Sequence, residues 1–287
     1  MKQSEPESPD MQQTETSVRV TRKGTRKVVI RRRPEVTGLD TRKEMLKRAR
    51  RAAVPVRSTF VQAPRGPADR SGPLKVFAHT GDKRGLRAYL MVIASCSQIN
   101  EDGWTTTLDS MVWARLFDTH LGVTAQSART GAWRTLLRLQ ERQLLTCTRR
   151  RGSSEISVTL LREDGSGDPY DRPDGKTPED RFFSIPNAFW TDEFDSKLDT
   201  PGLVMLLTVA HGKDWAAYPA KRLKEWYGWS EDTTERGLLQ VLEVGLVKRR
   251  KTFEKKPLLP VGSVLTYQYK VAGPMVTSSR KKPEATA

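Results

Sequence analysis

The side chains in this sequence best suited to chemistry are hydrogen-bond donors gathered on one predicted helix. Within TAQSARTGAWRTLLRLQERQLL (124–145), these side chains are Ser127, Arg129, Thr130, Arg134 and Arg138. Hydroxyl and guanidinium groups donate hydrogen bonds to phosphate oxygens, and a guanidinium also matches the O6 and N7 atoms of guanine. The set therefore indicates recognition of nucleic acid.

Further cations fall on two predicted hairpins, on a second helix and near the N-terminus. Arg149, Arg150 and Arg151 lie at the tip of the first hairpin, and Lys248, Arg249, Arg250 and Lys251 lie in the second. Arg236 lies on the later helix, and the N-terminal cations expected to contact phosphates are Arg31, Arg32, Arg33, Lys47, Arg48, Arg50 and Arg51. Such side chains mainly add affinity for a phosphate backbone, without reading its sequence.

Catalytic and metal-binding patterns are incomplete. The GKT at 175–177 resembles a phosphate-binding loop, but Tyr170 stands where that motif needs its first glycine. His79, His120 and His211 have no spacing typical of zinc ligands, and the chain has only 2 cysteines, with no Cys-x-x-Cys pair. We expect no enzymatic activity, no metal and no cofactor.

The charge balance favours a polyanionic partner. Lys and Arg number 50 against 34 Asp and Glu, a formal net charge of +16, and residues 1–72 alone hold 18 basic and 8 acidic side chains. The start of the sequence is polar and acidic, unlike a signal peptide, and no apolar run is long enough for a membrane span. These features predict a cytoplasmic protein associated with the nucleoid.

The elements that must position the first set of donors form one predicted unit. Apolar spacing predicts a helix from Arg84, and a second short helix with Thr106 or Thr107 as its N-cap. The third helix begins at Thr124 or Ser127, and EISVTLL (155–161) alternates as a half-buried strand does. Three helices followed by a basic hairpin are the order of a winged helix-turn-helix domain, whose third helix enters the major groove.

The same order returns later in the chain. TPGLVMLLTVAHG (200–212), with Thr200 as cap, predicts the first helix; PAKRLKEWYG and SEDTTERGLLQVLEVG predict the second and third, and two strands follow. A shift of 102 positions places Arg134 over Arg236, Leu136 over Leu238 and Gln143 over Gly245. The later third helix differs because Glu231, Asp232 and Glu235 crowd its first turns, where they would meet phosphate oxygens. This difference puts base reading by the second unit in doubt.

The predicted fold class is mainly α with small β-hairpins (α+β): two tandem winged helix-turn-helix domains preceded by a disordered basic tail. The expected divisions are a disordered Arg-rich tail (1–72), a first winged-helix domain (73–162), a linker (163–181), a second winged-helix domain (182–273) and a disordered C-terminal tail (274–287). Low apolar content and many prolines favour disorder in the first segment, where only a marginal helix capped by Asp40 is expected.

At LLREDGSGDPYDRP (160–173), and in FFSIPNAFW, LDTPGLVMLLTVA and LKEWYGWSEDTTERGLLQVLEVGLV (within 182–247), the sequence resembles tandem winged-helix proteins of actinobacteria. Many of these look like replication and control proteins of plasmids or integrative elements. The likeness covers about residues 75–272 and contains no catalytic motif. It implies non-enzymatic DNA binding, although the acidic later helix departs from initiators that read DNA with both modules.

Three functional hypotheses follow. The leading one is sequence-selective binding of double-stranded DNA for replication initiation or copy control of an actinobacterial plasmid or integrative element. The alternative in the same class is a transcriptional repressor, and the alternative in another class is a protein-interaction adaptor with a nucleic-acid-binding tail. The leading hypothesis allows a dimer on DNA and contact with host replication proteins, and it expects no membrane.

Overall fold

The first unit is built from three helices and a three-stranded antiparallel sheet. A computed structural model of the protein describes residues 15–20, 26–31, 34–64, 70–96, 99–101 and 103–277. The elements of the first unit are α3 (Lys83–Ser95), β4 (Thr105–Asp109), α4 (Ser110–Leu116), α5 (Ala125–Glu141), β5 (Leu145–Thr148) and β6 (Glu155–Leu160). In the sheet, β6 lies between β4 and β5.

Local capping explains where two of these helices begin. The Thr124 hydroxyl accepts a hydrogen bond from the Ser127 N–H at 3.3 Å, so Thr124, one of the two expected caps, is the N-cap of α5. The prediction for the second helix was wrong, because the Asp109 carboxylate caps α4 by accepting from the Met111 N–H at 2.7 Å. Thr106 and Thr107 instead lie in β4, which pairs with β6.

The second unit repeats this order and this sheet. Its elements are α8 (Thr200–His211), β8 (Ala216–Ala217), α9 (Ala220–Tyr227), α10 (Glu231–Glu243), β9 (Val247–Lys255) and β10 (Ser263–Val271). Here β10 lies between β8 and β9, as β6 does between β4 and β5. The N-cap of α8 is Asp199 and not the expected Thr200, which is the first residue of the helix.

The internal shift of 102 residues is matched in the backbone. Gln143 and Gly245 both follow the third helix with positive φ angles, 56° and 78°. The next residues, Leu144 and Leu246, are fully buried, and each donates its N–H to the carbonyl five residues earlier, at 3.2 and 3.0 Å. The two units therefore join their third helix to their hairpin in the same way.

Much of the segment expected to be a disordered tail is folded, so that prediction was wrong for residues 34–64. It contains α1 (Gly38–Ala49), β3 (Ala53–Arg57) and the 3₁₀ turn Ser58–Phe60. Thr37, not Asp40, is the N-cap of α1, and Asp40 completes a capping box. Met45 and Leu46 are buried, so the helix has an apolar face that packs on the rest of the protein.

Strand β3 joins this segment to a distant part of the chain. It pairs antiparallel with β7 (Phe182–Pro186), and the pair forms a sheet of its own. Two short helices follow β7, α6 (Ala188–Thr191) and α7 (Phe194–Lys197). Residues assigned by sequence to a tail and to the start of the second domain therefore form one element.

The segment 163–181, expected to be a linker, is held by a buried ion cluster. The Arg57 side chain is fully buried, and its guanidinium lies 2.6 Å from the Glu163 carboxylate, 2.7 Å from that of Asp171 and 2.8 Å from that of Asp180. Burial alone would lower the pKa of Arg57, but these three carboxylates raise it. The segment is thus packed against the body of the protein and does not serve as a free spacer.

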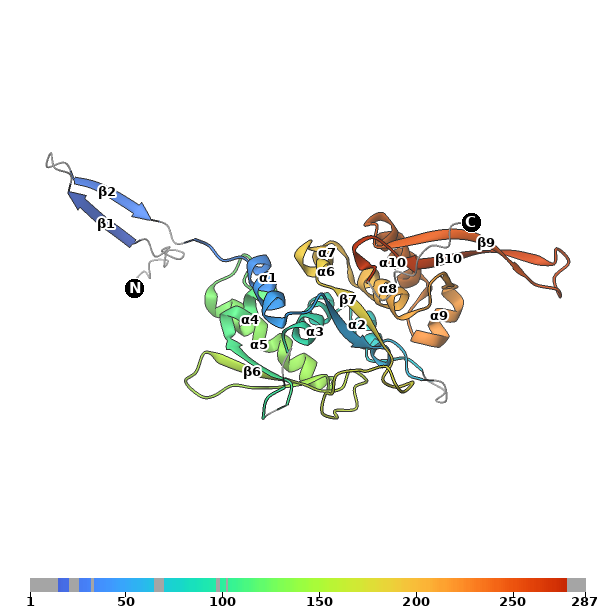
Figure 1. Ribbon diagram of the computed structural model, residues 1–287, viewed down its shortest axis with the longest axis horizontal. Coiled ribbons are helices and arrows are strands. Elements are labelled where there is room, and N and C mark those ends of the chain that lie inside the picture. Colours follow the sequence, from blue (N-terminus) through green and yellow to red (C-terminus); the bar gives the residue numbers. More distant parts are fainter. Residues whose placement is uncertain are drawn as a thin grey trace, which may run out of the picture.

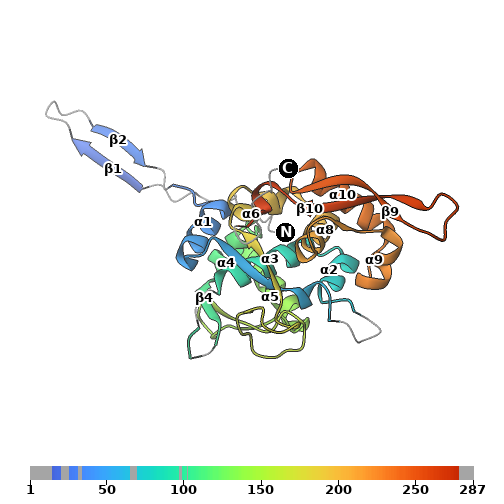
Figure 2. The ribbon, with the colours of Figure 1, turned by 45° about the vertical axis from the view of Figure 1, so that its right-hand side comes forward.

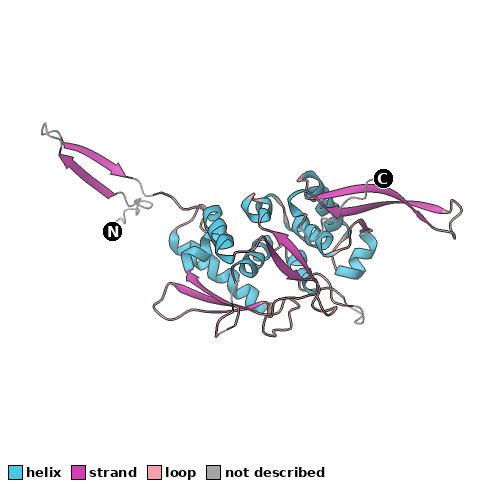
Figure 3. Ribbon diagram, viewed as in Figure 1, coloured by secondary structure: helices cyan, strands magenta, loops and turns pink. Residues whose placement is uncertain are grey.

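The two units share one hydrophobic core. Helix α2 (Leu74–Thr80) packs against α8, and the Gln62 side chain donates a hydrogen bond to the Trp226 carbonyl at 3.1 Å. Met275, in the expected C-terminal tail, is also buried, so that tail prediction was wrong for residues 274–277. Most helices lie together in the body of the molecule, from which hairpins project (Figure 3).

The described part of the chain is therefore a mixed α+β structure with small antiparallel sheets. Strands β1 (Glu15–Val20) and β2 (Arg26–Arg31) form a hairpin that stands apart from the body (Figures 1 and 2). Among the described residues, no helix has both the length and the apolar character needed to cross a membrane.

Candidate nucleic-acid interface

Helix α5 presents part of the predicted donor set to solvent. Ser127 lies in its first turn and Arg134 lies near its middle, and both are exposed. Within the part of the chain that the structure describes, Arg134 is in no ion pair. The opposite face, which includes Ala128, Ala132, Leu136 and Leu139, is buried. Core packing therefore holds the helix so that Ser127 and Arg134 are available to a ligand.

The remaining donors of α5 are partly engaged within the protein. Arg129 and Thr130 are half-buried. Burial alone would raise the pKa of Asp109, the N-cap of α4, but hydrogen bonds from Ser154 and Met111, together with the charges of Arg129 and Arg115, lower it. Arg138 lies against the N-cap of α3, where its guanidinium is 3.3 Å from the Asp82 carboxylate. The ion pair gives Arg138 a role in joining α3 to α5 that sequence reasoning did not anticipate.

Asp82 is the acceptor that joins α3 to α5. Its carboxylate accepts from the Gly85 N–H at 2.9 Å and lies 2.9 Å from the Arg142 guanidinium. Burial alone would raise the pKa of Asp82, but the Gly85 hydrogen bond and the charges of Arg138 and Arg142 lower it below its ordinary value. The folded state therefore favours the ionised carboxyl.

Replacing Asp82 with Ala is expected to lower the free energy of unfolding by about 1–2 kcal/mol near neutral pH, because the helix loses its cap and two ion pairs. A carboxyl whose pKa is lower in the folded state stabilises the fold above its unfolded-state pKa and loses this effect as the pH falls. The difference from wild type, measured by urea unfolding, should shrink as the pH falls below about 4, the ordinary pKa of an aspartate. A difference that is independent of pH would contradict this account.

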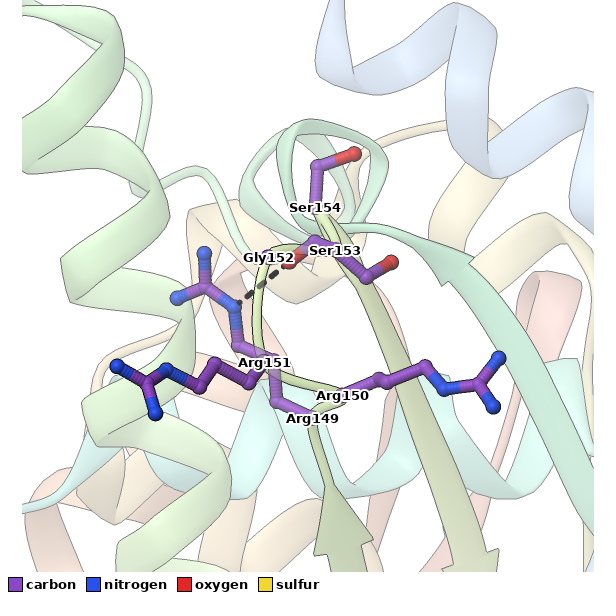
Figure 4. A pocket seen from close by; sticks show the side chains of 6 residues that line it. All are labelled: Arg149, Arg150, Arg151, Gly152, Ser153 and Ser154. Carbon is purple, nitrogen blue, oxygen red and sulfur yellow. Dashed lines mark hydrogen bonds between the residues drawn. The ribbon is translucent and has the colours of Figure 1, made fainter.

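The tip of hairpin β5–β6 is a cluster of three exposed arginines. Gly152 has a φ of 79° and turns the chain, and the Arg149 Nε donates a hydrogen bond to the Ser153 carbonyl at 3.1 Å. Figure 4 shows Arg150 and Arg151 pointing to opposite sides of the tip. The arginines line a shallow hollow with residues 152–154. This arrangement suits contacts with phosphates on both sides of a groove.

The corresponding helix of the second unit has the opposite charge character. Glu231 and Asp232 occupy the first turn of α10, where their negative charges interact favourably with the helix dipole. Glu235 follows on the exposed surface. The Arg236 guanidinium is 3.4 Å from the Asp232 carboxylate. Arg134 and Arg236 thus occupy equivalent places, but only Arg236 has a carboxylate beside it.

Hairpin β9–β10 carries the second basic cluster, Lys248, Arg249, Arg250 and Lys251, all of them exposed. The Arg249 guanidinium lies over the Tyr267 ring at 4.8 Å. The Arg250 guanidinium lies over the Trp215 ring at 4.4 Å and donates a hydrogen bond to the Gln268 side chain at 2.8 Å. The aromatic rings orient these cations along the hairpin.

The N-terminal cations divide between folded and undescribed parts. Lys47 and Arg48 are exposed in the last turn of α1, where their positive charges interact favourably with the helix dipole. Arg50 is exposed just after the helix and Arg51 is half-buried. Arg32, Arg33 and the side chain of Arg31 lie outside the described residues.

Other reactive groups offer little chemistry. Cys96 and Cys147 are buried, and burial raises the pKa of their thiols to about 12 and about 11. Both thiols are thus protonated near neutral pH and are poor nucleophiles. Among the described residues there is no group of three or more His, Cys, Asp or Glu side chains placed to hold a metal ion.

Sequence reasoning missed the residues at the far end of hairpin β9–β10. Lys255, Leu258 and Val261 are exposed there or close to it, and Lys256 is half-buried. The signal available was the run KTFEKKPLLPVGS (251–263), which places apolar residues between prolines directly after lysines.

Comparison of the chain with protein-family models, with curated proteins and with solved structures found no match.

Proposed function

We propose that this chain binds double-stranded DNA sequence-selectively, without catalysis, through two tandem winged-helix units. The observation that carries the proposal is the shared order of the two units, helix, strand, two helices and a basic hairpin, with the first strand added to the hairpin in one sheet. In a winged helix, the third helix enters the major groove and the hairpin lies along the backbone.

The charge distribution assigns different tasks to the two units. Helix α5 offers Ser127 and Arg134 to base edges, and the Arg149–Arg151 tip offers three cations to phosphates. Helix α10 carries carboxylates at its start, so the second unit contributes chiefly its hairpin, through Lys248 to Lys251. Exposed Lys47, Arg48 and Arg50 add affinity that does not depend on sequence.

Arg134→Ala is expected to weaken binding to a selected duplex by about 1–3 kcal/mol and to relax preference at one position, as loss of a bidentate guanine contact does. Arg236→Ala removes the equivalent arginine of the second unit and is the matched control. The loss of binding free energy should be smaller for Arg236→Ala and base preference should stay unchanged, because the Asp232 carboxylate lies 3.4 Å from that guanidinium and the first turn of α10 is acidic. Titration of both variants against the selected site and a scrambled duplex measures the difference.

Equal losses for the two variants, accompanied by two relaxed positions, would mean that both third helices read bases. The assignment of different tasks would then be wrong, while DNA binding would stand. If neither variant differs from wild type on any duplex, the third helices are not at the interface.

The proposed role is replication initiation or copy control of a plasmid or integrative element, in the cytoplasm at the nucleoid. Its support is the sequence resemblance at 160–173 and within 182–247 to tandem winged-helix proteins of such elements. A transcriptional repressor would use the same interface. Selection of bound sites from random duplexes, followed by mapping of those sites to a replication origin or to a promoter, separates the two roles.

A chain lacking residues 1–33 tests the adaptor alternative, in which nucleic-acid binding resides in the N-terminal segment. Under our proposal the shortened chain keeps its site preference and loses only affinity that depends strongly on salt. Loss of nearly all binding to DNA would favour the adaptor.

A further inference from the structure

The loop of hairpin β9–β10 is a rigid double turn. The Lys256 carbonyl accepts from the Leu259 N–H at 2.9 Å, and the Leu259 carbonyl accepts from the Gly262 N–H at 2.8 Å. Pro257 and Pro260 each occupy the second position of one of these turns, where their fixed φ is favourable. A third hydrogen bond, from the Lys256 N–H to the Gly262 carbonyl at 2.9 Å, closes the loop. The tip therefore loses little conformational entropy when it binds a partner.

This rigid tip holds apolar side chains in water. Leu258 and Val261 take the third position of the two turns, and their exposed fractions are 99% and 84%. Phe253, which is 73% exposed, lies opposite Leu265 in the strands that lead to the tip. A cluster of exposed apolar groups at the end of a projecting element usually marks a binding surface.

The hairpin carries this apolar tip away from the body of the protein. Each strand has 9 residues, and at about 3.4 Å per residue the hairpin is about 30 Å long. Val247 and Val271 anchor its base in the core, and its far end projects beyond the helices (Figure 1). The tip can therefore reach a surface that the helices do not touch.

Cations flank the apolar tip on the approach along β9. Between Val247 and Ser263, the basic residues are Lys248, Arg249, Arg250, Lys251, Lys255 and Lys256. The acidic residue in this stretch is Glu254, whose carboxylate is 2.6 Å from the Lys256 ammonium. A base-pair step in duplex DNA offers the complementary surface, because its stacked bases are apolar and phosphates line both sides of the groove.

We propose that the β9–β10 tip is a DNA-bending wedge, in which Leu258 and Val261 insert at a base-pair step from the minor groove while the lysines near them contact the adjacent phosphates. Aliphatic side chains that enter the minor groove unstack the bases and kink the duplex away from the protein, toward the major groove. The narrow minor groove admits side chains of this size but not a helix. The inference rests on the proposed DNA binding and adds distortion of the bound site.

The test uses the full chain and its selected duplex, with dyes at the two ends and 2-aminopurine placed at successive steps. Wild type should bring the dyes closer and raise 2-aminopurine fluorescence at one step. The double variant Leu258→Ser, Val261→Ser should lose both signals at saturating protein, while its affinity falls by about threefold to tenfold. Ile99→Ser, a change at another exposed apolar residue (68%), is the matched control and should behave as wild type.

Each outcome separates this inference from the proposed function. Binding by wild type without bending or unstacking, or full bending by the double variant, would overturn the wedge and leave DNA binding intact. A shift from dimer to monomer in the double variant without DNA would show that the tip joins two copies of this chain, which also overturns the wedge. Failure of wild type to bind any duplex would overturn both. Because the substituted side chains are exposed, thermal unfolding of the variants should match wild type.

Discussion

A chain that lacks residues 1–63 is expected to lose its cooperative unfolding transition or to melt more than about 10 °C below the full chain, whereas a chain that lacks residues 1–33 should melt with the full chain. The longer deletion removes Val56, Phe60 and Val61, all of them fully buried. Burial of each such side chain contributes about 1.5–3 kcal/mol to the free energy of unfolding, which is typically about 5–15 kcal/mol in total. Calorimetry on the two shortened chains measures the difference.

The point variant Phe60→Ala tests the same packing without shortening the chain. The Phe60 ring is 5.1 Å from the Tyr89 ring and 6.0 Å from the Phe77 ring, so its loss leaves a cavity beside α3 and α2. We expect Phe60→Ala to lower the free energy of unfolding, measured with denaturant, by about 3–5 kcal/mol. Normal melting of the chain without residues 1–63, or a negligible cost for Phe60→Ala, would mean that this segment is not part of the core.

Replacing Arg149, Arg150 and Arg151 together with Ala is expected to weaken binding to every duplex alike, by roughly 100- to 1,000-fold at about 0.1 M salt. The three exposed guanidiniums at the β5–β6 tip are assigned to phosphates, so their loss should reduce the slope of log K against log salt by about 2–3. Preference between selected and scrambled sites should stay nearly constant, because phosphate contacts carry no sequence information. Fluorescence anisotropy over a salt series measures both quantities.

A variant with the same change in formal charge provides the control. Lys176, Lys197 and Lys213 are exposed cations outside the proposed interface, and their joint replacement with Ala should change the salt slope much less. Equal effects of the two triple variants would mean that net charge alone governs binding. The β5–β6 tip would then have no specific place at the DNA.

Local signals in the sequence were sufficient for the elements within each unit. The Thr124 cap of α5, the helix α3 and the alternating strand β6 depend on contacts between residues a few positions apart, so their patterns are visible along the chain. The shift of 102 residues likewise predicted equivalent ends for α5 and α10. The difference in charge between the first turns of α5 and α10 could also be predicted, because the charge of a side chain follows from its residue type and does not depend on packing.

Local signals were misleading where two competing structures share a pattern. Thr106 and Thr107 are typical helix caps, but β-branched residues also favour strands, and pairing with β6 selects the strand. Asp109 then becomes the cap of α4, because the helix can begin only where β4 ends. The choice depends on a partner strand about 50 residues away, and a window around β4 does not contain that strand.

Patterns along the chain were enough to predict the two repeated units, their basic hairpins and their unequal third helices. The place of residues 34–64 and 163–181 in the folded body depends instead on contacts with distant parts of the chain. Strand β3 (AVPVR) is only five residues long and contains a proline, and it is ordered by pairing with β7 and by burial of Arg57 against Glu163, Asp171 and Asp180. Such contacts join residues more than 100 positions apart in the sequence. The free energy gained from these contacts exceeds the entropy lost in ordering the two segments only once both segments are in place.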